Sequence, residues 1–285
     1  MITPGGAIEP PARGRLVVCP TPIGNLGDVT LRVLEMLRAV DVIACEDTRR
    51  TRTLLARYEI AGTLVSYHEH NERERSRQLL ARLQAGETVA LVSDAGMPLV
   101  SDPGYEMVQA CIAAGLPVEV LPGASSVVTA LVASGLPAER WRFVVFLPSR
   151  GAGAKRAELA RVLSDTTETL VAFESPARLV ATMELLAEID AERPAAVCRE
   201  LTKLHEEVRR GSAAELAGYY REHPPRGEIV LVAGACAPDH ASHEEALGAL
   251  RALVDAGART RPAAGVVAKL TGASANELYR ALTDS

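Results

Sequence analysis

Several features typical of other protein classes are missing from this chain of 285 residues. Its five cysteines form no Cys-x-x-Cys pair and mostly stand inside apolar runs, which predicts buried thiols in a reducing compartment rather than a disulfide framework. No apolar stretch approaches the roughly 18 residues that span a bilayer. Residues 1–14 are rich in proline and glycine and lack the positive start and apolar segment of a signal peptide. We therefore expect a flexible leader on a cytoplasmic protein that has no membrane partner.

Lysine is also scarce, and the formal charge is −5, from 31 basic and 36 acidic side chains. This balance argues against indiscriminate adhesion to nucleic acid. Two segments have a positive net charge, unlike the chain as a whole. Residues 49–82 hold eight arginines and four glutamates (8 − 4 = +4), and residues 140–161 hold six basic side chains and one glutamate (6 − 1 = +5). Arginines suit phosphate contacts, but arginine-rich helices are more often solvated faces, so both readings stay open.

Two common nucleotide-binding motifs are absent. No Gly-x-Gly-x-x-Gly opens the first strand-to-helix turn, and no Gly-x-x-x-x-Gly-Lys-Ser/Thr run occurs. The pattern therefore argues against a dinucleotide-binding Rossmann enzyme and against a P-loop protein.

What is present is a regular alternation of short apolar runs with longer helical patterns, which predicts an α/β fold with a mostly parallel first sheet. The runs are apolar almost throughout, so helices should cover both faces. Asp102 before Pro103 predicts the start of a helix, and Gly115 predicts its end. The segment 126–134 is apolar almost all round, which predicts a helix buried between layers. The expected strands of this first domain, residues 15–122, are 16–19, 42–45, 64–67, 89–92 and 118–121.

A second strand set predicts a second α/β domain at residues 123–236, with strands at 143–147, 170–173, 195–198, 205–209 and 229–232. Residues 242–285 then show helical patterns. A helix is expected at 246–256, followed by two short helices across Thr271-Gly272-Ala273, and Ser274 with Glu277 has the spacing of a capping box. This C-terminal tail is helix-turn-helix-like.

Glycine and proline are concentrated after the first and fourth strands, at residues 20–28 and 93–104, with a further Pro-Gly pair at 122–123. Loops at the carboxyl ends of parallel strands form the crevice where such folds bind ligands. One such loop alone would be ordinary turn chemistry; three together predict a binding site.

These loops and two further segments resemble the motifs of a known protein family. Thr21-Pro-Ile-Gly-Asn-Leu-Gly-Asp28, Ala44-Cys-Glu-Asp-Thr-Arg49, Ser93-Asp-Ala-Gly-Met-Pro-Leu-Val-Ser-Asp-Pro-Gly104, Leu121-Pro-Gly-Ala-Ser125 and Phe173-Glu-Ser-Pro176 resemble the successive motifs of the ribosomal RNA small subunit methyltransferase I family. That family belongs to the tetrapyrrole methylases, and the resemblance runs from about residue 15 to 234. It implies the class III methyltransferase fold, two α/β domains with a C-terminal helical extension, and a homodimer. It also implies S-adenosylmethionine-dependent methylation of a cytidine ribose 2′-hydroxyl in the decoding region of 16S rRNA, within the small subunit.

By the same resemblance, a cofactor pocket should lie between the domains. An aromatic face attracts a sulfonium cation, and Asp94 could accept hydrogen bonds from the cofactor or simply cap its own turn. The implied cofactor-binding residues are Pro20, Asp94, Ala95, Gly96, Leu99, Ser125, Phe173 and Val232.

Methyl transfer to a hydroxyl needs in-line alignment and a base within hydrogen-bond reach. We expect Glu46, Asp47 and His68 to act there because they follow adjacent strands; Glu69 and Glu174 are weaker candidates. The alternative for Asp47 is that it caps the helix that follows. His68 and His70 lack a recognisable third ligand, so we expect no metal site. The candidates for contacting RNA are Arg49, Arg52, Arg150 and Lys155.

Two other functions remain open at this stage. One is methylation of a small tetrapyrrole-like molecule, against which the tail and the arginine segments argue. The other is a ribosome-assembly factor that keeps a pocket without catalysis.

Overall fold

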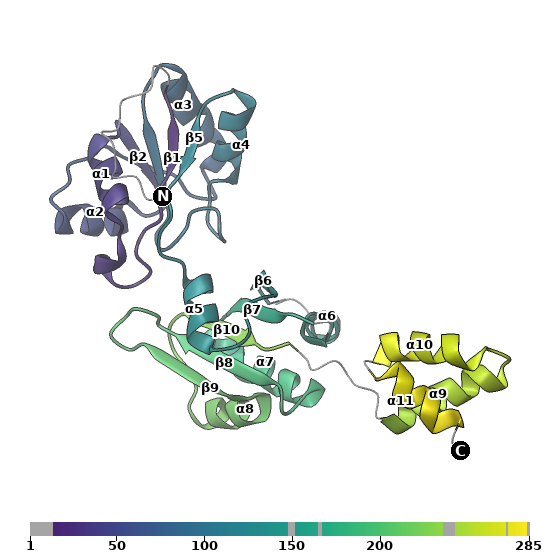
Figure 1. Ribbon diagram of the computed structural model, residues 1–285. Helices are drawn as coiled ribbons and strands as arrows, with labels where there is room; N and C mark the ends of the chain where they lie inside the picture. The colour runs from purple at the N-terminus through teal and green to yellow at the C-terminus, as the bar shows by residue number, and fades with distance from the viewer. Residues whose placement is uncertain (1–13, 148–151, 165–166, 236–242, 272, 284–285) are drawn as a thin grey trace.

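The computed structural model describes residues 14–147, 152–164, 167–235, 243–271 and 273–283. Within these ranges two five-stranded sheets and a helical bundle follow one another along the chain (Figure 1). All ten predicted strands are present. The largest shift is at β9, predicted over 205–209 and observed over Glu207–Ser212.

The first sheet is parallel throughout, in the order β3-β2-β4-β1-β5. Its strands are β1 (Leu16–Val18), β2 (Val42–Cys45), β3 (Leu64–Ser66), β4 (Val89–Val92) and β5 (Val118–Val120). α1 (Leu31–Ala39) and α2 (Thr48–Arg57) pack on one face, and α3 (Glu72–Gln84) and α4 (Tyr105–Ala113) pack on the other. This confirms the prediction of two covered faces, because β1, β2 and β4 are apolar and buried along their whole length.

The prediction that Asp102 caps α4 is wrong. The helix begins at Tyr105, and its N-cap is Gly104, whose φ of 140° favours glycine. Glu72 of α3 accepts hydrogen bonds from the amides of Gly104 (2.8 Å) and Glu106 (3.3 Å). Because a neighbouring helix supplies this carboxylate, α4 needs no local cap, and Asp102 stays in the loop before it.

The second sheet has the order β6-β7-β10-β8-β9 and is mostly antiparallel; only β6 and β7 run parallel. Its remaining strands are β6 (Trp141–Phe146), β7 (Thr169–Glu174), β8 (Pro194–Arg199) and β10 (Ile229–Ala233). α6 (Ala152–Ser164), α7 (Pro176–Ile189) and α8 (Ala213–Glu222) cover one face. α5 (Ser126–Ser134) covers the other, together with Ile23 from the first sheet's loops.

The expectation that α5 is buried between layers is wrong for one side of the helix. Val127 and Leu131 are buried against the second sheet, whereas Val128 and Val132 are 48% and 73% exposed. Since α5 has a sheet on one side only, Val128 and Val132 face away from the protein core.

The buried-thiol prediction is confirmed for the four cysteines that the structure describes. Burial raises the pKa of the Cys19 thiol to about 12 and that of Cys198 to about 11. These thiols therefore stay protonated near neutral pH. Cys236 lies outside the described residues.

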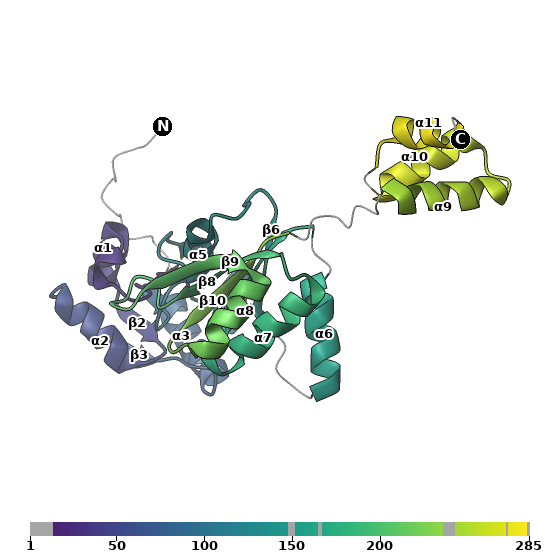
Figure 2. The same ribbon diagram turned by 90° about the horizontal axis from the view of Figure 1, so that it is seen from below.

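The tail forms a three-helix bundle of α9 (His243–Asp255), α10 (Thr260–Thr271) and α11 (Ala275–Thr283), with its own apolar core. Figures 1 and 2 show it apart from both sheets in two perpendicular views. The amide of Glu277 donates to the hydroxyl of Ser274 at 3.4 Å, which is one of the two bonds of the capping box that the spacing predicts. None of the helices in the described ranges is long and apolar enough to cross a membrane.

Candidate functional site

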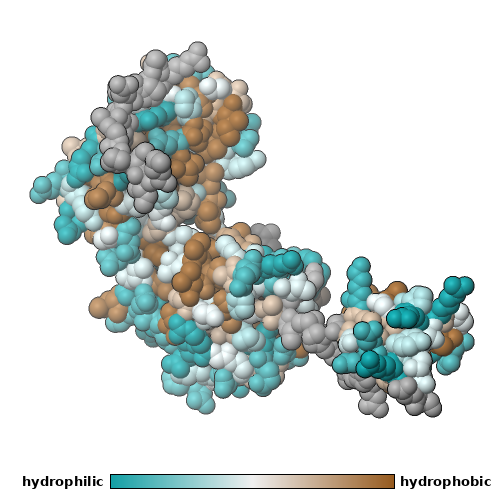
Figure 3. Space-filling view, in the orientation of Figure 1, coloured by the Kyte–Doolittle hydropathy of each residue, from teal (hydrophilic) through white to brown (hydrophobic). Residues whose placement is uncertain are grey.

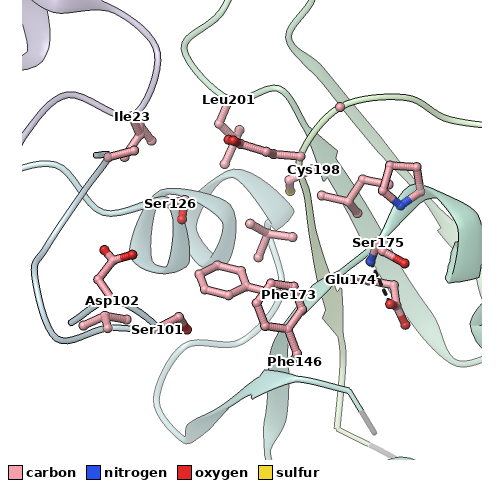
Figure 4. Close-up of a pocket in the computed structure, with 17 residues that line it drawn as sticks. Ile23, Ser101, Asp102, Ser126, Phe146, Phe173, Glu174, Ser175, Cys198 and Leu201 are labelled. Carbon is pink, nitrogen blue, oxygen red and sulfur yellow. Dashed lines mark hydrogen bonds between the residues drawn. The ribbon is translucent and has the colours of Figure 1, made fainter. Parts of the chain in front are cut away.

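A cavity of about 420 Å³ lies between the two sheets (Figure 4). The loops after β1 and β4 form its first wall, the ends of β6 and β7 and the segment entering β10 form its second, and the start of α5 lies between them. It is lined by Ile23, Ala95, Val100, Ser101, Asp102, Ser126, Phe146, Phe173, Glu174, Ser175, Pro176, Cys198, Leu201, Gly227, Glu228, Ile229 and Val230.

The loops of the first wall are joined by backbone hydrogen bonds. Thr21 and Gly96 exchange both N–H···O bonds, at 2.9 and 3.0 Å, and the Thr21 hydroxyl donates to the carbonyl of Ser93. Gly96 has a φ of 80°, which permits the turn that brings the two chains together. The first wall is therefore a rigid backbone surface.

A close approach joins this wall to the segment that enters α5. A Cβ atom built on Gly123 would stand 2.4 Å from Cγ of Pro20, so only glycine fits beside that proline ring. Pro20, an expected cofactor residue, is buried by this contact. Its position links the loop after β1 to the start of α5.

The second wall contains a buried charge network. The Glu174 carboxylate accepts hydrogen bonds from the Ser175 amide and the Thr182 hydroxyl, both at 2.7 Å, and pairs with Arg178 at 2.6 Å. The Glu174 side chain is 1% exposed. With these three donors on its two oxygens, Glu174 fixes the start of α7 at the cavity.

A hydrogen bond between the two halves closes one side of the cavity. The amide of Asn25, after β1, donates to the Thr202 hydroxyl, after β8, at 3.1 Å. Glycine at position 24 allows this approach, because a Cβ there would meet the Leu201 carbonyl at 3.0 Å. Thr202 itself has a φ of 65°, which is strained for a β-branched residue. The two halves are thus held together at the cavity.

Two of the predicted carboxylates already have partners. Asp47 caps α2 by accepting the Arg49 amide at 2.8 Å, and its carboxylate pairs with the Arg49 guanidinium at 2.7 Å, which lowers the Asp47 pKa. Asp94 accepts the Asp47 amide at 2.8 Å and lies 3.5 Å from Arg50. The alternative reading of Asp47 as a helix cap is therefore observed.

Glu46 and Asp102 differ from these two carboxylates. Burial and the charge of Asp94 raise the pKa of Glu46, whereas Arg50 and His68 act in the opposite direction. Burial and the charge of Glu46 raise the pKa of Asp102 to about 6. Asp102 therefore takes up a proton near pH 6, and Glu46 does so at a higher pH than an ordinary glutamate.

His68 lies beside these groups. Its amide donates to the Asn71 side chain at 2.9 Å, and its Nε2 lies 3.1 Å from Nδ2 of Asn71. Its Nδ1 is buried and has no hydrogen-bond partner. The His70 ring is 5.9 Å away, and among the described residues no group of three or more His, Cys, Asp or Glu is arranged to hold a metal.

The structure brings only part of the expected cofactor set to the cavity wall. Ala95 and Phe173 line it, and the Phe173 ring packs against Phe146 at 5.4 Å between centroids. Val232 is buried in β10, beyond the lining residue Val230. The remaining expected residues lie in the same loops without lining the cavity: Pro20, Asp94, Gly96, Leu99 and Ser125.

Sequence reasoning missed several lining residues. Ser101 and Asp102 lie inside the motif at residues 93–104, where the Asp102-Pro103 pair predicts a helix cap and not a lining residue. Phe146 and Leu201 lie outside the quoted motifs, and no local signal marks them.

The expected RNA-contacting residues divide into two groups. Arg49 and Arg52 are exposed on α2, and the Arg49 side chain is 85% exposed. Arg150 lies outside the described residues, and so does the side chain of Lys155 in α6.

Comparisons with known proteins agree with this architecture. The chain matches the model of the family described as Tetrapyrrole (Corrin/Porphyrin) Methylases over residues 15–217. It is also similar to the Thermus thermophilus uroporphyrin-III C-methyltransferase solved in complex with S-adenyl homocysteine: the TM-score is 0.53 and the identity 25%, covering 78% of this chain and 97% of that one. The fold is that of a tetrapyrrole methylase, and the chain belongs to that family.

Two curated relatives narrow the assignment, and both are named ribosomal RNA small subunit methyltransferase I. The relative from Micromonospora olivasterospora is 48% identical over 269 residues, covering 93% of this chain and 85% of the relative. The relative from Mesorhizobium japonicum is 44% identical over 286 residues, covering 98% of this chain and 96% of the relative. This chain belongs to the ribosomal RNA small subunit methyltransferase I family and is a methyltransferase, which confirms the resemblance that its motifs predict.

Proposed function

We propose that this protein transfers a methyl group from S-adenosylmethionine to the ribose 2′-hydroxyl of a cytidine in the decoding region of 16S rRNA, within the small ribosomal subunit. The observation that carries the proposal is the sequence identity of 48% to the Micromonospora olivasterospora relative named ribosomal RNA small subunit methyltransferase I, which covers 93% of this chain. Methyl transfer would take place in the cavity between the two walls and not on an open surface.

The cavity suits the cofactor in size and chemistry. Its volume of about 420 Å³ falls in the range of small-molecule sites, roughly 300 to 1,000 Å³. The rings of Phe146 and Phe173 offer aromatic faces, which attract a sulfonium cation. When bound, S-adenosylmethionine supplies an electrophilic methyl group. We propose that Ala95 and Phe173 contact it directly and that Pro20, Asp94, Gly96, Leu99 and Ser125 hold the surrounding loops.

The protein must also align the substrate hydroxyl and exclude water. The Asn25–Thr202 contact holds the two walls relative to each other, and the buried Glu174–Arg178 pair fixes the second wall, a geometry that favours in-line transfer. We propose that Glu46 and His68, which do not line the cavity themselves, act on proton transfer there, because the charge of Glu46 raises the pKa of the lining residue Asp102 and His68 lies close enough to act on Glu46. For Asp47, the geometry favours the role of helix cap.

We propose that the exposed arginines of α2 contact the RNA backbone. Arg49 and Arg52 project from the helix that starts at the end of β2, beside Glu46. Guanidinium groups suit phosphate oxygens. The proposed RNA surface also includes Arg150, Lys155 and the tail helices, and removing residues 242–285 should weaken RNA binding more than cofactor binding.

We propose that two copies of the chain associate through the exposed apolar face of α5 and α4. Val132 is 73% exposed and Ile112 is 58% exposed. Figure 3 shows hydrophobic surface over both helices on one side of the molecule. Patches of this kind mark interaction sites. A Val132→Glu variant should sediment as a smaller species than the wild type. The assembled enzyme would act in the cytoplasm.

A second candidate function is methylation of a tetrapyrrole. The similarity to a uroporphyrin-III C-methyltransferase favours it, although the identity is only 25%.

The deciding experiment uses methyl-labelled S-adenosylmethionine and small subunits from a strain that lacks the enzyme. Incorporation into these subunits is expected. The proposal fails if the protein binds the cofactor but labels neither the subunits nor naked 16S rRNA, and labelling of porphyrinoid precursors would favour the second candidate.

A further inference from the structure

Asp102 occupies a place that the helix-cap interpretation does not explain. It lies in the loop between β4 and α4, lines the cavity, and leaves the capping of α4 to Glu72. Figure 4 shows it beside Ser101, on the wall across the cavity from Glu174 and Ser175. The aromatic rings of Phe146 and Phe173 lie between these two walls. Its carboxyl group therefore belongs to the site and not to the helix.

The backbone that presents Asp102 is strained. Leu99 has a φ of 72° and Ser101 a φ of 69°, both in the left-handed region, which non-glycine residues rarely adopt. Strain of this kind persists where surrounding contacts enforce it, and it clusters at functional sites. Here the turns at Leu99 and Ser101 hold Val100, Ser101 and Asp102 against the cavity.

Other carboxylates of the cavity wall are neutralised by cations. Glu174 pairs with Arg178, and Glu228 pairs with Lys203 at 2.9 Å. Among the lining residues that the structure describes, Asp102 is the carboxylate for which no ion pair is found within 4 Å. It is therefore the lining carboxylate best suited to accept a proton.

We infer that Asp102 accepts the proton of the ribose hydroxyl that is methylated, an inference that rests on the proposed function. The hydroxyl oxygen forms a bond to the methyl carbon while the carbon–sulfur bond breaks and leaves its electron pair on sulfur. The hydroxyl proton passes to the Asp102 carboxylate and is later released to water. Alignment by the two walls and proton acceptance by Asp102 are separate contributions.

The charged groups around Asp102 support this role. Burial raises its pKa most, the charges of Glu46 and Asp94 raise it further, and a hydrogen bond with Ser93 lowers it, so that the value is about 6. Arg50 and His68 face Glu46 from α2 and from the loop after β3. A base with this pKa is largely ionised at neutral pH and still holds a proton more strongly than an ordinary aspartate. Glu46 thereby acts as a positioning residue through its charge.

Asp102→Asn is the direct test, because it keeps the shape of the side chain and removes its capacity to take the proton. Turnover on small subunits should fall about 100-fold or more. Cofactor affinity by calorimetry should stay within about three-fold of the wild type, and Asp102→Glu should restore part of the turnover. The matched control is Asp190→Asn at the end of α7, which should leave turnover unchanged.

A second readout does not depend on activity. In a carbon-13 titration of the aspartate carboxyl groups, one signal should have a midpoint near 6, vanish in Asp102→Asn, and move to lower pH in Glu46→Gln. The inference is overturned if Asp102→Asn keeps wild-type turnover, if it loses cofactor binding in parallel with turnover, or if no such signal exists. A wild-type protein that methylates no RNA would instead overturn the proposed function itself.

Discussion

The backbone amide of Asn25 donates a hydrogen bond to the side-chain hydroxyl of Thr202 at 3.1 Å, across 177 positions of sequence. Asn25 follows β1 of the first sheet, and Thr202 follows β8 of the second. Their neighbours Ile23 and Leu201 line the cavity. This contact therefore couples the geometry of the site to the relative position of the two sheets.

Thr202→Val removes the acceptor and keeps the shape of the side chain. The loss of one hydrogen bond at the cavity, about 1 kcal/mol, should weaken cofactor binding by roughly five-fold, measured by calorimetry. Thr202→Ser keeps the hydroxyl and should bind like the wild type. If the valine and serine variants bind equally well, the contact does not hold the site closed.

Gly123→Ala should destabilise the protein, because the new Cβ would stand 2.4 Å from Cγ of Pro20. Overpacking of this kind costs about 1 to 3 kcal/mol in the free energy of unfolding, which urea titration measures. Gly218→Ala in α8 is the matched control: no atom lies within 4 Å of its new Cβ, so stability should rise by about 0.5 to 1 kcal/mol. Equal effects of the two changes would contradict the close approach.

Glu174→Gln should lower the free energy of unfolding by about 3 kcal/mol, because it leaves the partly buried Arg178 without its carboxylate. The exposed pair of Glu184 and Arg221 provides the comparison, and Glu184→Gln should cost less than about 1 kcal/mol. Urea titration of both variants checks the prediction. Similar costs at the two sites would show that the cavity wall does not depend on the buried network.

The pH dependence of stability should report on Asp102. Its folded-state pKa of about 6 lies above the value of about 3.9 for an unperturbed aspartate, so the folded protein holds this proton more tightly than the unfolded chain. The stability associated with this group is therefore complete below about pH 4 and is lost as pH rises through 6, by at most about 3 kcal/mol.

Asp102→Asn removes this dependence, so the variant should gain stability over the wild type at pH 8 and much less at pH 4. Denaturant titrations at the two pH values measure the difference. An identical stability difference at both pH values would contradict the raised pKa.

Much of the fold could be predicted because its strands are short, apolar and separated by strong turn signals. β2 and β4 match their predicted bounds, and both faces of the first sheet are covered as expected. The start of α4 could not be predicted, since the carboxylate that caps it belongs to Glu72, 32 positions away from Gly104. The exposure of Val132 likewise depends on which side of α5 meets the second sheet.

The site was predicted less completely than the fold. The motif after β4 correctly indicated a binding loop, and Phe173 lies at the cavity as the resemblance implies. Sequence alone could not separate Glu46 from Asp47, because the difference lies in the Arg49 contacts that occupy Asp47. Leu201 reaches the cavity through the packing of the two halves, which no local pattern encodes. The cofactor and RNA roles of individual residues, and the domain boundaries at residues 122 and 236, stay predictions.

The most direct test of the central claim is the position of the transferred methyl group. After reaction with labelled S-adenosylmethionine, 16S rRNA from small subunits is hydrolysed with alkali, which cannot cleave next to a 2′-O-methylated ribose. The account predicts one alkali-resistant dinucleotide that carries the label on a 2′-O-methylcytidine. Label recovered only in base-methylated mononucleotides, or absent from the RNA while the cofactor is bound, would contradict it.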